Sequence, residues 1–376
     1  MSILRFRKSG GHSPDYPFIL LILLLTVFGL VMLSSASSDL GKIKFKDPYY
    51  HLKHQLLYGL SLGIVGFIGA SFLNYRWWQK LAFPLLIIGL VCLTLVFTPL
   101  GLSHSGSNRW VNIGEFSFQP AELLKLIFII YLAAWFSDKK SRQTDFSTGF
   151  LPFLVVCGAV TFLILIQPST TTVAIIMSSA LIVYFASGAK LRYIAGTIIL
   201  GIAVLACFVC LTDYRIARVT TFWQTIMNGS SSVNVEGQGY HINQSLIAIG
   251  SGGLFGVGLG QSVLKYKYLP EPIGDSIFAV IAEELGFIGA SLLIIVFLTF
   301  LLRGFMIAKK SCDQFARLTV IGFMCIIGIQ TFIHIAAISG IMPLTGVPLP
   351  FISYGGTSLV IFLTMSGIIV NISKYT

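Results

Sequence analysis

Charged residues are scarce in this chain, and acidic residues are the scarcest. Only 14 of its 376 residues are aspartate or glutamate, and charged residues of both signs make up 10% of the sequence. A water-soluble domain of this size needs far more polar surface. The mean hydropathy of +0.87 and the hydrophobic content of 55% therefore exclude a soluble protein and indicate one that lies in a membrane.

Cysteine is also sparse, which limits redox and zinc chemistry. Five of the six cysteines lie in apolar runs, and the sixth, Cys312, lies in a basic loop. Cys207 and Cys210 have the spacing of some zinc and redox motifs. Thiols that pack as small hydrophobic side chains are the better interpretation.

Long apolar runs are what the chain has in abundance. A helix needs roughly 20 apolar residues to cross a bilayer, and continuous rather than alternating apolar runs favour helices over barrel strands. We predict an all-α, polytopic membrane protein with a single domain over residues 1–376. About ten spans are expected, at 17–37, 54–73, 81–100, 120–137, 150–167, 170–187, 194–212, 276–302, 317–340 and 356–373.

Positive charge orients these spans. Of the 25 lysine and arginine residues, fifteen fall on the side of the N-terminus, nine fall on the opposite side, and Lys125 lies within a span. Cytoplasmic loops carry the excess of positive charge, so both termini are expected in the cytoplasm. The first span follows Arg5, Arg7 and Lys8 and lacks a convincing cleavage site, so we expect it to be uncleaved.

The outer side is basic as well, although it has fewer cations. Such a surface suits lipid headgroups or a phosphorylated substrate. For the first outer loop, from Lys42 to Lys53, simple solvation is the preferred interpretation. The large loop at about 213–275 contains apolar patches, so short helices and turns are expected there. Its cations could bind phosphate, and they include Arg215, Arg218 and Lys265.

Asp275 is the most informative acid. It follows a turn marked by Pro272 and Gly274 and precedes an apolar run. Aspartate at such a position is a favoured helix N-cap, and local chemistry alone favours that interpretation. A helix N-terminus also keeps a carboxylate ionised and able to accept a proton. On a helix that continues from Asp275, Glu283 would face the same cavity, and Glu284 would pair with a neighbouring span.

Other polar groups lie near the predicted spans. Arg109 can be interpreted equally well as an interfacial anchor or as a functional residue. Glu122 and Lys125 share one face of a helix. Because a lone charge at the centre of a bilayer costs roughly 2.5–3.5 kcal/mol, we expect the two to pair. Gln244 and Ser245 lie in a glycine-rich stretch that either packs tightly or, as we favour, lines a substrate groove. Residues 340–356 predict an ordered, non-helical segment.

These segments together resemble the SEDS family (shape, elongation, division, sporulation), the polytopic glycosyltransferases that include FtsW and RodA. The resemblance covers nearly the whole chain, and 258–271 is more similar to FtsW than to RodA. Residues 273–274 and Ser276 depart from the family's usual residues around the acid, as do Ser169 and His334 elsewhere. The motifs that carry the resemblance are 34–37, 109–110, 119–120 with Glu122 and Lys125, 214–215 with Arg218, 244–245, 250–253, 269–271 and 350–356.

The resemblance implies polymerisation of lipid II into glycan strands at the outer face of the cytoplasmic membrane, for septal synthesis in cell division. Asp275 falls where the family carries its essential aspartate and would orient or deprotonate the acceptor hydroxyl. The basic residues Arg109, Arg215, Arg218 and Lys265 could offset the charge of the diphosphate. Gln244, Ser245 and Glu271 are further substrate-binding candidates. No cofactor is certain, although a divalent cation (magnesium or manganese) could assist.

The implied partners are lipid II, a class B penicillin-binding protein of the FtsI type and other divisome proteins, with no nucleic acid. Two other functions stay open. A transporter that flips lipid II would use Glu122, Lys125 and Glu283 along its path, with Asp275 merely as a cap. A non-catalytic scaffold would recruit the penicillin-binding protein.

Overall fold

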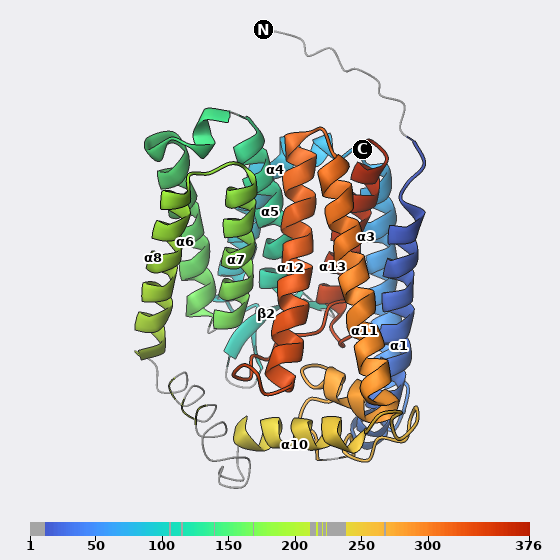
Figure 1. Ribbon diagram of the computed structural model, residues 1–376. Helices are drawn as coiled ribbons and strands as arrows, with labels where there is room; N and C mark the ends of the chain where they lie inside the picture. The colour runs from blue at the N-terminus through green and yellow to red at the C-terminus, as the bar shows by residue number, and fades with distance from the viewer. Residues whose placement is uncertain are drawn as a thin grey trace.

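The chain forms a bundle of long apolar helices (Figure 1). The computed structural model describes residues 12–376 apart from 105–106, 114–115, 139, 168, 211–215, 217–219, 221–222, 224–237 and 267. In this part of the chain, nine helices are long and apolar enough to cross a membrane. The 17-residue helix α7 occupies the remaining predicted span. The prediction of an all-α, multi-pass membrane fold is confirmed.

The helices follow the predicted spans to within a few residues at most boundaries. The second span combines α2, a π-helical turn (η1) and α3, and η3 continues into α6. The helical elements are α1 (Tyr16–Phe45), α2 (Tyr50–His54), η1 (Gln55–Leu60), α3 (Ser61–Phe72), α4 (Arg76–Leu95), α5 (Pro120–Asp138), η2 (Lys140–Gln143), η3 (Phe146–Phe150), α6 (Leu151–Ile166), α7 (Thr170–Ala186), α8 (Leu191–Cys210), α10 (Gln238–Ser251), α11 (Ile277–Lys310), α12 (Gln314–Ile338) and α13 (Gly356–Ser373).

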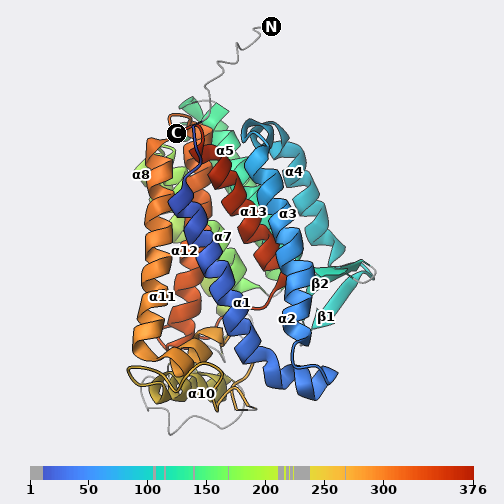
Figure 2. The ribbon, with the colours of Figure 1, turned by 90° about the vertical axis from the view of Figure 1, so that its right-hand side faces the viewer.

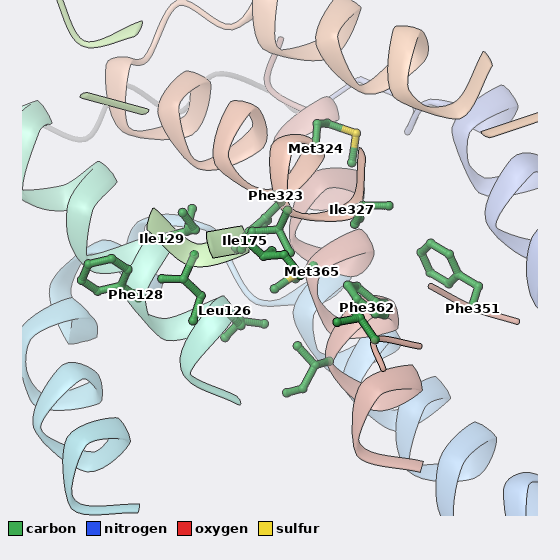
Figure 3. Close-up of a cluster of buried hydrophobic side chains, with 14 of the residues drawn as sticks. Leu126, Phe128, Ile129, Ile175, Phe323, Met324, Ile327, Phe351, Phe362 and Met365 are labelled. Atoms are coloured by element: carbon green, nitrogen blue, oxygen red, sulfur yellow. The ribbon is translucent and has the colours of Figure 1, made fainter. Parts of the chain in front are cut away.

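Three helices form the centre of the bundle. These are α5, α12 and α13. In their apolar membrane-spanning stretches 78%, 72% and 78% of the residues are buried, against 6% in α8. Phe128 of α5, Phe323 of α12 and Phe362 of α13 are wholly buried (Figure 3). A helix that is apolar all round suits such a position, because it meets protein or lipid on every side.

The two described ends of the chain meet at one end of the bundle. The backbone N–H of His12 donates to the carbonyl of Lys374 at 2.9 Å. Asp15 caps α1 through the N–H of Phe18 and forms an ion pair with Arg303 at 3.0 Å. An even number of crossings requires this arrangement. The expected cytoplasmic position of this end stays a prediction.

The opposite end carries the irregular structure (Figures 1 and 2). Helix α10 lies across it, roughly perpendicular to the bundle axis. Between α4 and α5, strands β1 (Gly101–His104), β2 (Ser107–Ile113) and β3 (Phe116–Phe118) form an antiparallel sheet. Strands this short give too little alternation for the sequence to predict them. Pairs such as Leu102 with Trp110 and Val111 with Phe118 show the register.

Helix α11 is interrupted at Gly286, which has φ 67° and ψ −170°. The break frees the carbonyls of Glu283 and Glu284, and these accept from the N–H groups of Val257 and Gly258, both at 3.0 Å. In return, the N–H of Phe287 donates to the carbonyl of Gly253 at 2.9 Å. The glycine-rich stretch at 252–258 therefore packs against helix backbone, in agreement with the packing interpretation of its glycines.

We expect Gly286→Ala to destabilise the protein by more than about 2 kcal/mol, because its backbone conformation suits glycine alone. A Cβ there would also lie 2.3 Å from the backbone nitrogen of Gly256. Gly158→Ala in α6 is the control, since nothing lies within 4 Å of its Cβ position. Thermal unfolding in detergent should separate the two variants, and equal melting temperatures would contradict the assigned backbone constraint.

Candidate active site at the end opposite the termini

Asp275 lies just outside α11. The helix begins at Ile277, and Ser276 occupies its N-cap position without a side-chain capping bond. The expectation that Asp275 caps the helix is therefore wrong by one residue. A turn centred on Glu271, with φ 47°, extends the loop, because the carbonyl of Glu271 accepts from the N–H groups of Gly274 and Ser276.

The half-buried Asp275 packs against the non-helical segment 339–355, which connects α12 to α13 as predicted. A Cβ built on Gly346 would lie 3.1 Å from Oδ2 of Asp275. Ser353 Oγ donates to the carbonyl of Gly274 at 2.8 Å. The N–H of Tyr354 donates to the carbonyl of Ile273, also at 2.8 Å. The backbone just before Asp275 is thus fixed to this segment.

Side chains of α12 hold the segment in place. Gln330 Nε2 donates to the carbonyl of Pro348 at 2.8 Å. His334 Nδ1 donates to the carbonyl of Val347 at 2.6 Å. His334, one of the residues that depart from the usual pattern, therefore holds the backbone of this segment.

A small polar cavity of about 50 Å³ lies on the other side of the turn at 345–348. Arg109 from β2, Glu122 from α5 and Ser169 before α7 line it together with Gly346. Gly346 therefore lines this cavity and also lies next to the carboxylate of Asp275. The sequence did not identify Thr345 or Thr170–Thr172 as site residues. The glycines and prolines at 340–356 were the signal that this segment is shaped for a site.

The predicted contact between Glu122 and Lys125 is present. Lys125 Nζ lies 2.6 Å from Glu122 Oε1 and donates to Gln330 Oε1 at 2.7 Å. Both charged side chains are almost fully buried. The second carboxylate oxygen, Glu122 Oε2, is buried without a hydrogen-bond partner in the described part of the chain. Glu122, which lines the cavity, therefore carries one acceptor oxygen without a hydrogen bond.

Glu283 does not face Asp275. Its carboxylate accepts from Ser262 Oγ at 2.5 Å and from the N–H of Val263 at 2.9 Å. The helical-wheel argument fails because Asp275 precedes the helix, so the two residues do not share a helical face. Glu284 contacts α1, as expected, through Ser35 Oγ at 2.6 Å.

Lys265 belongs to the same buried group as Glu284. Its amine lies 2.8 Å from Glu284 Oε1, and its side chain is 1% exposed. The structure does not bring it to the Asp275 cavity.

The remaining predicted residues have separate positions. On α10, Ser245 Oγ donates to the carbonyl of His241 within the helix, and Gln244 is partly buried. Glu271 is exposed and forms the turn described above. Arg215 and Arg218 lie outside the described residues. No three His, Cys, Asp or Glu side chains gather in the described part of the chain, and the divalent cation stays a prediction.

His241 fixes α10 beside Asp275. Its Nε2 lies 2.5 Å from Ser276 Oγ, and that hydroxyl donates to the carbonyl of Pro270 at 2.7 Å. The hydroxyl has one proton, so the imidazole must be the donor to it. Burial lowers the pKa of His241 from 6.5 to about 4, which keeps the ring neutral near pH 7.

The depressed pKa predicts a dependence of stability on pH. Undocked α10 takes up a proton near pH 6.5, whereas the docked state does so only near pH 4. The stabilisation is therefore complete above pH 6.5 and falls as the pH is lowered through this window, by about 2 kcal/mol at pH 5. Melting temperatures at pH 7.5 and pH 5 should show the decrease. It should shrink in His241→Gln, and an equal decrease in that variant would contradict the assignment.

The buried ion pair between Glu122 and Lys125 predicts how stability changes when one or both charges are removed. Lys125→Met leaves Glu122 charged and without its partner, which should cost about 3–5 kcal/mol. Glu122→Gln combined with Lys125→Met removes both charges and should recover most of this loss. Thermal unfolding of the three proteins in detergent measures the effect. A double variant as unstable as Lys125→Met would show that the charge pair is not the cause.

Comparisons with known proteins agree with this architecture. The family model for FtsW, RodA and SpoVE, described as "Cell cycle protein", matches residues 16–376. Stage V sporulation protein E of Bacillus subtilis is 36% identical over 368 residues, which cover 97% of this chain and 98% of the relative. A probable peptidoglycan glycosyltransferase FtsW of Geobacter sulfurreducens is 38% identical over 360 residues, with 96% of this chain and 95% of the relative covered.

Solved structures show the same fold. A chain from a structure on the structural coordination of polymerization and crosslinking by a peptidoglycan synthase complex aligns with a TM-score of 0.78 and 25% identity, covering 96% of this chain and 98% of its own. The rod shape determining protein RodA of Thermus thermophilus aligns with a TM-score of 0.70 and 25% identity, covering 96% of each chain. The chain is therefore a member of the FtsW, RodA and SpoVE family of multi-pass membrane proteins.

Proposed function

We propose that this protein is a peptidoglycan glycosyltransferase that polymerises lipid II at the outer face of the cytoplasmic membrane. The observation that carries the proposal is the position of Asp275. Its carboxylate contacts the 345–348 turn, and that turn lines the polar cavity of Arg109 and Glu122. The name of the Geobacter relative supports this activity.

In the proposed reaction, the 4-hydroxyl of the acceptor sugar attacks the anomeric carbon of the donor. A new C–O bond forms, the bond from the anomeric carbon to the diphosphate oxygen breaks, and polyprenyl diphosphate leaves. Asp275 orients the hydroxyl and takes its proton. A positioned carboxylate of this kind contributes about 10²- to 10⁴-fold to a rate. No step is assigned to a metal ion.

The cavity supplies the complementary electrostatics. Arg109 Nε donates to the carbonyl of Gln167 at 3.2 Å, which holds the guanidinium at the cavity. There it can offset negative charge that develops on the diphosphate. Arg215 and Arg218 stay in the proposal as further phosphate ligands, on the resemblance alone.

The proposal extends to partners and to the cellular role. Polymerised strands need crosslinking, and one similar chain comes from a complex that is described as coordinating polymerization with crosslinking. We therefore assign a class B penicillin-binding protein as the partner, together with other divisome proteins. Septal synthesis is the favoured role, because residues 258–271 resemble FtsW.

Asp275→Asn tests the proposal with the smallest change in shape. We expect normal folding and a loss of glycan polymer of at least about 100-fold, because the amide cannot take the proton. The assay uses purified protein, lipid II and the partner, with polymer resolved on gels. Asp47→Asn is the matched control, since Asp47 is a partly exposed outer-loop acid that pairs with Lys53.

Polymer at the control level from Asp275→Asn would overturn the catalytic role. Lost folding of the variant would instead assign Asp275 a structural role. Lipid II translocation into vesicles, undiminished in a protein that makes no polymer, would favour the transporter.

A further inference from the structure

A second, larger concave site lies away from Asp275. A groove of about 650 Å³ is formed by α1, α2 and the turn at 259–265. Its volume falls within the roughly 300–1,000 Å³ of small-molecule sites. None of the residues that line it lines the cavity of Arg109 and Glu122, so a molecule in the groove would be outside that cavity.

The groove changes from apolar to polar along a single face of α1. Val27, Val31, Ser34, Ser38 and Lys42 all line it, and steps of three and four residues place them on one side of the helix. The two valines come first, then the hydroxyls, and the lysine comes last. This order matches the passage from hydrocarbon to headgroup in a bilayer.

Residues 49–56, which include α2 and the start of η1, repeat the same order in the opposite chain direction. Tyr49, with its hydroxyl, stands at the connection from α1, and Leu52 and Leu56 follow along the groove. At 1.5 Å per residue, the 30 residues of α1 extend about 45 Å. The hydrocarbon core is only about 30 Å thick, so the end with Ser38 and Lys42 reaches headgroup depth.

Charge selects the kind of headgroup. The residues that line the groove include two lysines, Lys42 and Lys265, and no aspartate, glutamate or arginine. Lys265 is neutralised by its buried ion pair with Glu284. Nearby, Asp47 forms an ion pair with Lys53. The exposed Lys42 therefore gives the polar end of the groove a net positive charge, which differs from the simple solvation that the sequence favoured for this loop.

We propose that the groove binds one anionic phospholipid of the surrounding bilayer. Its phosphate would contact Lys42 and the hydroxyls of Ser34 and Ser38, and an acyl chain would lie along Val31 and Leu56. Because none of its lining residues lines the cavity of Arg109 and Glu122, the groove suits a resident phospholipid better than the polyprenyl-linked substrate. The site is independent of the proposed polymerase activity.

Such a lipid would support the 259–265 turn. Leu259, Gly260 and Lys265 form one wall of the groove. The same turn supplies the donors from Ser262 and Val263 that hold Glu283 on α11. A filled groove therefore stabilises the outer half of α11, which begins directly after Asp275.

Lipid retention tests the proposal without any need for activity. The purified full-length protein is mixed with equal amounts of phosphatidylglycerol and phosphatidylcholine in detergent, and bound lipid is counted by native mass spectrometry. We expect a preference for phosphatidylglycerol. Lys42→Ala should reduce it about fivefold, since a lysine near anionic lipid contributes about 1 kcal/mol. Lys44→Ala, an exposed lysine of the same helix outside the groove, should change it less than twofold.

A steric variant gives a second readout. Val31→Trp fills the apolar part of the groove and should abolish retention of the preferred lipid. Leu24→Trp is the control, because Leu24 is 43% exposed on the same helix but does not line the groove. Equal retention in Lys42→Ala and Lys44→Ala would overturn the proposal. So would displacement of phosphatidylglycerol by an equal concentration of polyprenyl diphosphate, which would identify the groove as a substrate site.

Discussion

The ion pair between Glu122 and Lys125 determines how the candidate site is built. An isolated charge inside a bundle is costly, so the lysine amine is held by both the glutamate and the amide oxygen of Gln330. The other end of the same amide donates to Pro348. This contact fixes the 345–348 turn, and the turn places Gly346 against Asp275. One desolvated charge therefore orders a path of hydrogen bonds from α5 through α12 to the turn beside Asp275.

The few acids of this chain have distinct uses. Glu284 neutralises Lys265, Asp15 joins the first span to Arg303, and Glu283 collects donors from a turn. Asp275 differs from the buried glutamates because it remains partly accessible beside a polar cavity. Carboxylates that are fully committed to buried partners stabilise the bundle, whereas a partly accessible one can meet a substrate.

Sequence reasoning predicted the spans well, because a bilayer imposes a minimum length and an apolar composition on any helix that crosses it. It predicted the Glu122–Lys125 contact from local spacing alone. It misplaced the start of α11 by one residue, since the turn at Glu271 depends on backbone bonds that composition does not reveal. It also predicted that Glu283 would face the same cavity as Asp275. That prediction is wrong, because helical periodicity applies only after the helix has begun.

Contacts between distant segments were beyond such reasoning. The meeting of Gly346 with Asp275 joins two loops about seventy residues apart, and no local pattern encodes it. The sheet at 101–118 was missed for a related reason, since its short strands are stabilised mainly by pairing with one another. The glycine and proline content of 340–356 predicted an irregular segment, but it did not predict which residues that segment would contact.

The break at Gly286 has a mechanical consequence for the membrane-embedded protein. It divides α11 into a short outer rod, bonded to the 252–258 turn, and a long rod that crosses the bundle. The break gives the part next to Asp275 a direction that a straight helix would not allow. Because the 252–258 stretch also bonds to Phe287 and Ile288 after the break, that direction is held fixed relative to the long rod.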